Sequence, residues 1–379
     1  MKAITNTKIV LLDSIIFNGT ILIDQGKIVD FGEAKNVEIP PQTEIIDAMG
    51  LYSGPGLIDI HSHAGNGKWF HEDAQEASDH HLKHGTTTLL PALYNSLTLE
   101  DYIEGIRHIK KESQTGSARI IQGLYMEGPY LNPKYGCETD KNKWASGIDK
   151  EMYMPLIKEA GDFAKVWCIA PELENMDMFV NDVYDAIPNI IFSVAHSEAS
   201  PEQIFRYIPQ GLNLATHHTN ATGDLQKYPE VRGVCVDEAV NFCDDIYAEL
   251  ICDSMGIHVD PFMLRLVVKI KGKDRIILIS DNFAADGPVP DGYDGVTDIN
   301  FDSNGEIAGS KLTLDVACQN MIKHTGAGIC DVFRFASYNP SRLLGLRDRG
   351  CFRRGNRADI VIVSDIFEVN KTLLDGDII

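Results

Sequence analysis

The sequence of 379 residues is poor in basic residues, with 34 Lys and Arg against 55 Asp and Glu, and its formal net charge is −21 at pH 7. A protein that wraps a nucleic acid or lies on an anionic membrane needs a basic surface to displace counterions or to meet lipid headgroups. We therefore expect neither nucleic acid nor a membrane as a partner. An anionic small molecule would need local positive groups, a metal ion or helix N-termini to bind.

Paired cysteines and a leader segment are also missing. The eight cysteines form no Cys-x-x-Cys pair and no dense cluster, so neither a zinc ribbon nor a disulfide framework is indicated. A reducing setting is the simplest interpretation. Residues 1–20 lack the continuous apolar stretch of a signal peptide or a membrane span. We expect the protein to be cytoplasmic.

What the sequence does have is an ordinary globular composition, with 44% hydrophobic and 23% charged residues. Its length allows one domain of roughly 250 residues and a smaller one. Both chain ends carry short β-type runs separated by turn residues, and each end alone is too short for a stable sheet. We expect residues 1–53 and 349–379 to form one discontinuous β-sandwich domain.

Apolar β-type runs alternate with helix-like segments over residues 54–348. The runs are GLIDIH (56–61), TTTLLPA (86–92), ARIIQGLYME (118–127), KVWCIAPE (165–172), NIIFSVAH (189–196), LNLATH (212–217), DIYAELICD (245–253) and RIILIS (275–280). Strands buried on both faces are apolar in this way. No G-x-G-x-x-G follows an early strand, which weakens a Rossmann interpretation. The pattern predicts an α/β protein with a TIM-like (β/α)8 barrel.

Chemistry in such a barrel lies at the carboxyl ends of the strands. Imidazoles and carboxylates, the ligands of divalent metals, follow several of the runs. These side chains are His61, His63, Glu127, His196, His217 and Asp281. His61 and His63 are two residues apart on a strand, so both point to the same side and can converge on one ion. Glu127 could bind one ion or bridge two.

Asp281 directly follows an apolar strand, and two interpretations compete for it. Asp is a favoured helix N-cap, but a carboxylate beside a metal at this rim is well placed to handle protons, and we predict the second role. His218 adjoins His217 but points the other way along the strand, so we exclude it. The other histidines in polar, helix-like stretches are expected to be solvated. They are His71, His80, His81, His84, His108 and His324.

The chain carries, in this order, the motifs PGLIDIHSH, HGTTTLLPAL, LYMEGPYLNP, AHSEAS, ATHHTNAT, ELICDSMGIHVDP, LISDNFAADG and GSKLTLDVACQNM. In order and spacing they resemble the N-acetylglucosamine-6-phosphate deacetylases of the amidohydrolase superfamily. MEGPYLNP and the His-plus-Asn-Ala motif are fairly specific to the deacetylases, whereas PGLIDIHSH and the closing RRGNRADIVIVS are shared across the superfamily. The resemblance implies hydrolysis of the N-acetyl group of an amino-sugar phosphate, and a homodimer.

The resemblance also implies roles for individual residues. It implies one or two divalent ions, zinc or iron, with Glu127, His196 and His217 as one ligand set and His61 with His63 supporting a second ion. Asp281 matches the catalytic acid/base of the family. The positions that match substrate contacts are Asn220, Ala221 and His258. Residues 305–310 resemble a loop that closes over the ligand.

Three departures from the family pattern concern the substrate rather than the metal. Cys137-Glu138 stands where the family has Ala or Thr followed by His, so Cys137 is expected beside the substrate. Lys227, with Arg232 nearby, stands where a phosphate-binding arginine is usual, and lysine lacks the bidentate fork. Thr222 replaces a methionine.

These departures leave other substrates open. The alternatives are another N-acyl amino sugar, an N-acyl amino acid or a cyclic amide. A non-catalytic barrel used as a scaffold is a further alternative. Such a scaffold would be expected to lose metal ligands or the acid at the end of the last strand, and this chain retains them all.

Overall fold

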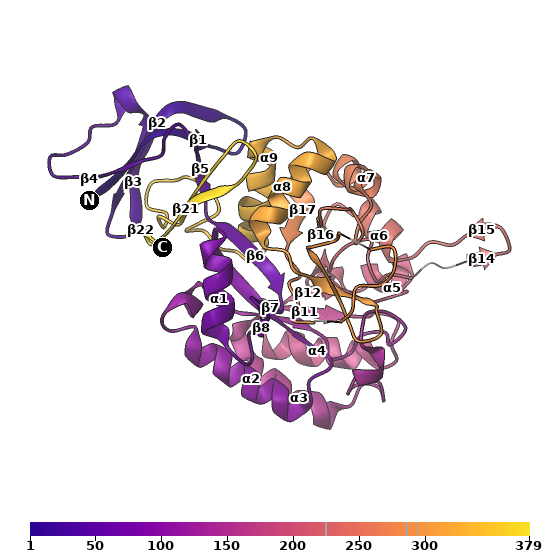
Figure 1. The fold of residues 1–379 in the computed structure, drawn as a ribbon. Helices are drawn as coiled ribbons and strands as arrows, with labels where there is room; N and C mark the ends of the chain where they lie inside the picture. Colours follow the sequence, from indigo (N-terminus) through magenta and orange to yellow (C-terminus); the bar gives the residue numbers. More distant parts are fainter. Residues whose placement is uncertain (224–225, 286, 294) are drawn as a thin grey trace.

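The computed structural model describes residues 1–223, 226–285, 287–293 and 295–379. Its larger part is a barrel of eight parallel strands in one sheet, with helices around it (Figure 1). The strands are β6 (Leu57–Ser62), β9 (Thr86–Tyr94), β10 (Leu124–Glu127), β11 (Ala164–Ile169), β12 (Ile191–Val194), β13 (Leu212–Ala215), β16 (Tyr247–Ile251) and β17 (Ile276–Ile279). Each lies within one of the predicted runs or overlaps it, which confirms the predicted barrel.

Hydrogen bonds just beyond β6 and β17 nearly close this sheet. The backbone N–H of Asp281 donates to the carbonyl oxygen of His61 at 2.9 Å. The N–H of His63 donates to the carbonyl oxygen of Asn282 at 2.8 Å. The two edge strands of the sheet therefore meet at the point where the predicted ligands of the first strand lie beside Asp281.

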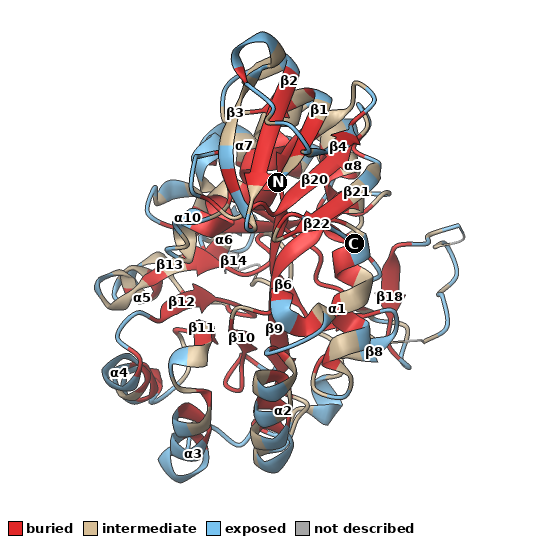
Figure 2. Cartoon of the chain, turned by 90° about the vertical axis from the view of Figure 1, so that its left-hand side faces the viewer, coloured by how far each residue is buried: buried red, intermediate tan, exposed pale blue. Residues whose placement is uncertain are grey.

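Helices connect successive strands and cover the outside of the barrel. They are α1 (Ala74–Lys83), α2 (Leu99–Glu112), α3 (Lys150–Ala160), α4 (Met176–Ala186), α5 (Pro201–Phe205), α6 (Val236–Phe242), α7 (Pro261–Lys271), α8 (Leu314–Thr325), α9 (Ile329–Phe333) and α10 (Asn339–Leu343). A π-helical turn spans Arg334–Tyr338. Short 3-10 turns lie at Ala34–Asn36, Ser117–Ile120, Thr139–Lys141, Gly161–Phe163, Ile208–Gln210 and Lys273–Arg275. In Figure 2 the strands are buried and the outer faces of the helices are exposed.

The starts of these helices follow from local sequence. The Thr98 side chain accepts a hydrogen bond from the N–H of Asp101, and Asp101 bonds back to the Thr98 backbone, which forms a capping box for α2. Ser200 and Gln203 form the same arrangement before α5, where Pro201 takes the first helical position. None of the described helices is long and apolar enough to cross a membrane.

The barrel core has two layers that follow from strand alternation. In β10, Leu124 and Met126 face the helices, whereas Tyr125 belongs to the cluster inside the barrel. Ile58 and Ile60 of β6 also face inward. Polar side chains then replace apolar ones where each strand reaches the rim, which places Glu127 above a packed apolar interior.

A second sheet combines strands from both chain ends. Its strands are β1 (Lys2–Val10), β2 (Ile15–Asp24), β3 (Lys27–Glu33), β4 (Glu44–Asp47), β5 (Tyr52–Pro55), β20 (Ile360–Val363), β21 (Val369–Leu374) and β22 (Asp377–Ile378). β5 pairs with β1 on one side and with β20 on the other, so it joins the two ends of the chain. The sheet lies at one end of the molecule, with both termini in it (Figure 1). The exact domain boundaries, at residues 53/54 and 348/349, stay a prediction.

Three hairpins extend from the barrel. β7 (Ala64–Gly65) pairs with β8 (Lys68–Trp69), and β18 (Ile299–Phe301) pairs with β19 (Ile307–Ser310). β14 (Gln226–Tyr228) pairs with β15 (Val231–Arg232) and extends away from the body of the barrel (Figure 1). The β19 strand contains most of the segment predicted to close over a ligand.

Candidate metal centre and active site

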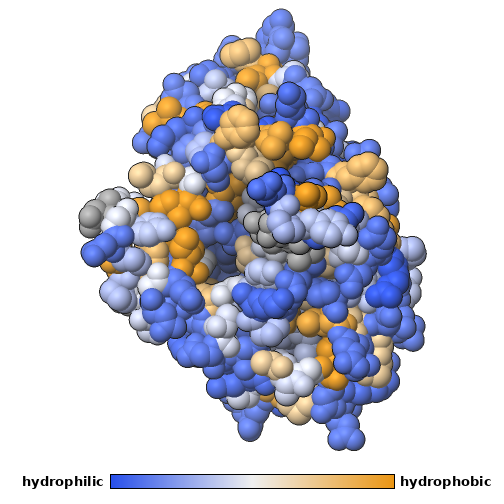
Figure 3. All heavy atoms as spheres, turned by 90° about the vertical axis from the view of Figure 1, so that its right-hand side faces the viewer, coloured by the Kyte–Doolittle hydropathy of each residue, from blue (hydrophilic) through white to orange (hydrophobic). Residues whose placement is uncertain are grey.

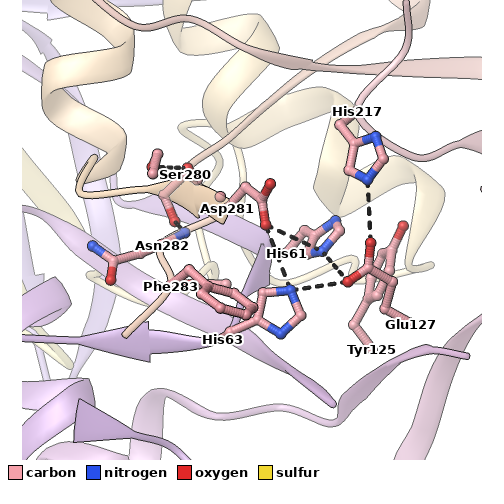
Figure 4. A network of polar contacts seen from close by, with 12 residues as sticks. His61, His63, Tyr125, Glu127, His217, Ser280, Asp281, Asn282 and Phe283 are labelled. Carbon is pink, nitrogen blue, oxygen red and sulfur yellow. Dashed lines mark hydrogen bonds and ion pairs between the residues drawn. The ribbon is translucent and has the colours of Figure 1, made fainter. Parts of the chain in front are cut away.

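The carboxylate of Glu127 lies at the centre of the cluster at the barrel rim. Its Oε1 is 3.0 Å from Nε2 of His196 and 3.2 Å from Nε2 of His217. Its Oε2 is 3.0 Å from Nε2 of His63 and 3.6 Å from Nε2 of His61. Figure 4 shows His61 and His63 on one side of this carboxylate and His217 on the other. Each oxygen of Glu127 thus faces its own pair of imidazoles, and the structure brings all five predicted ligands together.

Strained backbone holds several of these side chains in place. His196 has φ of 43°, His217 of 28° and Asp281 of 48°. This left-handed region is uncommon for residues other than glycine, and such residues persist where the surrounding structure imposes them. Gly136, with φ of 94°, packs against the ring of His196, and a Cβ there would lie 2.7 Å from that ring. The rim is therefore built to aim these side chains inward.

Asp281 faces the first-strand pair of histidines. Its Oδ1 is 3.6 Å from Nε2 of His61 and 3.5 Å from Nε2 of His63. The side chain is 10% exposed, so it remains in contact with the cavity. Among the described residues beyond Asp281, the next helix is α8, which begins at Leu314. The alternative role of Asp281 as a helix N-cap is therefore wrong.

The buried carboxylate of Glu127 and the buried imidazole of His61 stabilise each other in their charged forms. Burial alone would raise the pKa of Glu127, but the charge of His61 and hydrogen bonds from His196 and His217 hold that pKa well below its ordinary value. Burial alone would lower the pKa of His61, but the charge of Glu127 raises it well above its ordinary value. The buried carboxylate therefore needs positive charge beside it. Protonated imidazoles or divalent cations can provide that charge.

The donor set fits divalent metal ions. Two groups, His61 with His63 and Glu127, and Glu127 with His196 and His217, each have ligand atoms within 4.8 Å of one another. All are buried. Within the described residues, Nε2 of His61 has no hydrogen-bond partner. Buried polar atoms are normally paired, and an imidazole nitrogen aimed at a carboxylate pair is a suitable ligand.

A cavity of about 230 Å³ opens over this cluster. Four of the predicted ligands, all but His61, line it. So do four residues predicted to contact substrate, which are Cys137, Asn220, Ala221 and His258. Ile307 and Gly309 of β19 contribute another wall. The molecular surface is hollowed near the centre of the face on which β14 and β15 lie (Figure 3).

Two lining aromatic residues were not identified from sequence. Tyr94 and Phe283 both line the cavity beside His63, with ring centroids 5.9 Å and 5.1 Å from its ring. Tyr94 ends β9 and Phe283 follows β17, so both occupy strand ends, where a search for aromatic as well as charged residues would have found them. They give the cavity an aromatic wall next to His63.

His258 is held in place from both ring nitrogens. Its Nδ1 lies 3.1 Å from Oδ2 of Asp253, and its Nε2 lies 3.1 Å from the carbonyl oxygen of Gly309. Hydrogen bonds from His258 and neighbouring backbone outweigh the effect of burial and lower the pKa of Asp253. The ionised Asp253 accepts a hydrogen bond from the N–H at Nδ1, which fixes the orientation of the ring.

Lys227 and Arg232 lie outside the cavity. Both are exposed on the hairpin formed by β14 and β15, and neither lines the cavity. Arg232 forms an ion pair with Glu238 of α6. Within one chain, the residues predicted to bind phosphate are therefore separate from the metal cluster.

Two buried residues differ from what was expected from sequence: His81 was assigned the wrong environment, and Glu249 was assigned no role. His81 is fully buried, so the expectation that it is solvated is wrong, whereas the other five histidines of that group are half-buried. Glu249 of β16 is also fully buried, and its Oε2 is 3.2 Å from Nδ1 of His61. The signal for Glu249 was a lone acid within an apolar run, which is rare unless the acid has partners.

No protein-family model matches the sequence. The chain is similar to N-acetylglucosamine-6-phosphate deacetylase of Bacillus subtilis. The two are 30% identical over an alignment 396 residues long, which covers 99% of this chain and 96% of that protein. It is 27% identical to N-acetylgalactosamine-6-phosphate deacetylase of Escherichia coli, over 86% of each. The crystal structure of N-acetylglucosamine-6-phosphate deacetylase from Pasteurella multocida is similar, with a TM-score of 0.86, 26% identity and coverage of 100% and 99% of the two chains.

The barrel and the carboxylate between two histidine pairs define a hydrolase of the amidohydrolase superfamily, whose members use divalent metals. Within that superfamily the similarity extends over nearly the whole chain. The protein belongs to the N-acetylglucosamine-6-phosphate deacetylase family.

Proposed function

We propose that the protein removes the N-acetyl group of an amino-sugar phosphate, converting N-acetylglucosamine-6-phosphate to glucosamine-6-phosphate and acetate. The observation that carries this proposal is the placement of Glu127 between two pairs of imidazoles, with Asp281 next to one of the pairs. Family membership supports the choice of an N-acetyl amino sugar.

We assign the ligands as two sets that share Glu127. His196 and His217 hold one divalent ion with Glu127, and His61 and His63 support a second. An ion bound there supplies Lewis acidity, which lowers the pKa of bound water to about 7 and polarises a carbonyl oxygen. Zinc and iron suit ligands of this kind, because both accept imidazole and carboxylate.

Asp281 is the acid/base of the proposed reaction. Its Oδ1 faces the first-strand imidazoles at 3.5 and 3.6 Å, so it lies on the same side of the cavity as the ligands. It accepts a proton from the attacking water and returns that proton to the departing amine nitrogen. Breaking the C–N bond in this way gives acetic acid and a neutral amine, and the proton that the acid then releases is balanced by the proton that the amine takes up, which leaves acetate and an ammonium group.

The other lining residues orient the sugar. His258 presents an Nε2 that lies 3.1 Å from the carbonyl oxygen of Gly309, and a sugar hydroxyl can displace that contact. Asn220 and Ala221 line the side of the cavity next to His217, and Cys137 lines the side next to His196. Tyr94 and Phe283 exclude water from the acyl group.

We propose a homodimer for recognition of the phosphate. Lys227 and Arg232 lie on a hairpin that extends away from the barrel, outside the cavity of their own chain (Figure 1). A hairpin with exposed basic residues is suited to reach the cavity of a second copy, where Lys227 would provide a point charge for phosphate. All eight cysteines are free, which supports the proposed reducing, cytoplasmic setting.

A substrate panel tests this function. Acetate release is measured with N-acetylglucosamine, N-acetylgalactosamine and N-acetylmannosamine, each with and without a 6-phosphate, after reconstitution with zinc or iron. The proposal expects the highest kcat/KM for N-acetylglucosamine-6-phosphate. A preference for the galactosamine compound would assign the activity named for the Escherichia coli relative instead. No acetate from any compound would refute the proposal.

A further inference from the structure

We propose that Glu249 is a positioning residue that prepares His61 to bind a metal ion. Glu249 lies on β16, between β13 and β17 in the barrel sheet, and although it begins the motif ELICDSMGIHVDP, no role was predicted for it. Its carboxylate contacts Nδ1 of His61, behind the ring as seen from Nε2, and thereby sets the affinity of the ion that His61 binds. The inference rests on the proposed metal-dependent function and adds to it a residue that is not itself a ligand.

The oxygen Oε2 of Glu249 faces three donors. Nδ1 of His61 lies 3.2 Å from it, and the hydroxyl of Tyr125 donates to it at 3.2 Å. The backbone N–H of His217 donates to the same oxygen at 3.3 Å. Glu249, His61 and Tyr125 are all 0% exposed, so none of these contacts competes with bulk water. One buried oxygen thus connects the first-strand and sixth-strand ligands.

The contact with Glu249 selects one tautomer of His61. A carboxylate accepts a hydrogen bond, so Nδ1 of the ring keeps its proton, and Nε2 is the nitrogen whose lone pair is available when a metal ion replaces the proton that Glu127 favours there. That Nε2 lies 3.6 Å from Oε2 of Glu127 and 3.6 Å from Oδ1 of Asp281. The lone pair therefore faces the position where the two carboxylates converge. A carboxylate behind a ligating histidine both fixes the ring and makes it a stronger ligand.

Of the four ligand histidines, His61 is the one that has a carboxylate behind its ring among the described residues. Nδ1 of His217 faces the carbonyl oxygen of Asn220 at 3.2 Å. Nδ1 of His63 and Nδ1 of His196 have no hydrogen-bond partner among the described atoms. Removing the charge of Glu249 should therefore weaken the ion bound by His61 and leave the ion bound by His196 and His217 nearly unchanged.

Tyr125 holds the carboxylate of Glu249 in place through its hydroxyl group. Its ring stacks on His61 with centroids 4.2 Å apart, and its hydroxyl also contacts Oγ1 of Thr216 at 2.8 Å. Ser193 contacts the same Thr216 oxygen at 2.6 Å. This polar chain within the barrel fixes the hydroxyl that donates to Glu249. Together with the ring of His61, it helps to stabilise a buried carboxylate in an otherwise apolar strand.

The test measures metal affinity rather than turnover. Metal-free protein is titrated with zinc against a chromophoric chelator, and bound zinc per chain is measured by elemental analysis. Glu249→Gln keeps the shape of the side chain and one acceptor, whereas Glu249→Leu removes both acceptors. We expect one of the two zinc affinities, that of the ion bound by His61, to fall by about 10- to 100-fold in Glu249→Gln and by more in Glu249→Leu. The other affinity should stay within about twofold.

Glu172→Gln is a matched control. Glu172 is a carboxylate near the same rim that accepts hydrogen bonds from Asn132 and Ser197 and contacts no imidazole. It should keep both wild-type affinities. Thermal unfolding of the metal-free variants checks that each one folds. If Glu249→Leu does not fold, the test relies on Glu249→Gln alone.

Three outcomes would overturn the inference. If the wild type binds two ions, the inference fails when Glu249→Gln leaves both affinities unchanged or weakens both equally. If the wild type binds a single ion, the inference fails when Glu249→Gln leaves its affinity unchanged. A single ion weakened by this substitution would support the inference. Failure of the proposed function is a separate result, because the affinities are measured without any sugar substrate.

Discussion

The proposed metal site and the proposed phosphate-binding hairpin, formed by β14 and β15, differ in how completely one chain builds them. At the metal end, the five proposed ligands and Asp281 come from the ends of five barrel strands, with His61 and His63 both at the first, and their side chains are at most 10% exposed. The hairpin carries Lys227 and Arg232 in exposed positions, away from the cavity. One chain therefore builds the proposed hydrolytic site completely within its barrel, whereas the residues proposed to bind phosphate lie outside the cavity of that chain.

Loss of the proposed acid/base should have the largest effect at the metal end. Asp281→Asn removes the group that moves the proton but keeps the size of the side chain, and it should lower kcat by about 10³-fold. Bound metal per chain should stay at the wild-type value, because Asp281 is not assigned as a ligand. Steady-state acetate release and elemental analysis measure both. Wild-type turnover in this variant would refute the role of Asp281.

Loss of a ligand should affect metal content and activity together. His196→Ala removes a nitrogen that lies 3.0 Å from Oε1 of Glu127. We expect about one ion fewer per chain, with activity falling on the order of 100-fold. Adding excess zinc should restore part of the activity, and it should not restore Asp281→Asn. Unchanged metal content would contradict the assignment of His196 as a ligand.

Charge reversal on the hairpin should affect binding but not chemistry. Lys227→Glu should raise KM about tenfold for the phosphorylated sugar, because it replaces attraction of the phosphate by repulsion, and kcat should stay near wild type. The unphosphorylated sugar is the control and should show little change. An equal effect on both sugars would remove Lys227 from phosphate recognition. Light scattering on the same samples shows whether the protein is a dimer.

The smallest expected effect concerns His81, which packs behind the first-strand ligands. Its Nε2 donates to the carbonyl oxygen of Ala64 at 2.8 Å, and burial lowers its pKa to about 3. In the unfolded chain the pKa is about 6.5, so the unfolded state binds more protons between these values. Stability should therefore be full above about pH 6.5 and fall as the pH decreases toward the folded pKa.

His81→Gln isolates this contribution, because glutamine keeps a donor for Ala64 but does not titrate. Between about pH 6 and pH 4.5, the free energy of unfolding of the wild type should fall more steeply than that of the variant, by up to about 1.4 kcal/mol per pH unit. Urea unfolding of metal-free samples measures both slopes. Parallel slopes would show that His81 is not held neutral by burial.

Much of the barrel and its ligands could be predicted from sequence because both follow simple rules. Strands buried on both faces are apolar throughout, and a ligand such as His196 stands out where such a run ends. Glu127 was identified in the same way. The pairing of β5 with both β1 and β20 could not be predicted, because it joins segments about 300 residues apart and depends on packing rather than local pattern.

Residues that act through tertiary contacts were harder to identify. Glu249 lies within an apolar strand, and its role depends on Nδ1 of His61, which is 188 residues away in sequence. His81 lies in a helix whose sequence is polar, and its burial follows from the packing of α1 against the β7 hairpin. The position of Lys227 depended on the path of a hairpin, which spacing alone does not fix.

The central claim is that Glu127 and its histidines make deacetylation depend on metal. The most direct measurement is acetate release from N-acetylglucosamine-6-phosphate by metal-free protein during titration with zinc or iron. The account predicts almost no activity without metal and a rise in rate that parallels the ions bound per chain, with no recovery in Glu127→Gln. Full activity in the metal-free protein, or in Glu127→Gln, would contradict it.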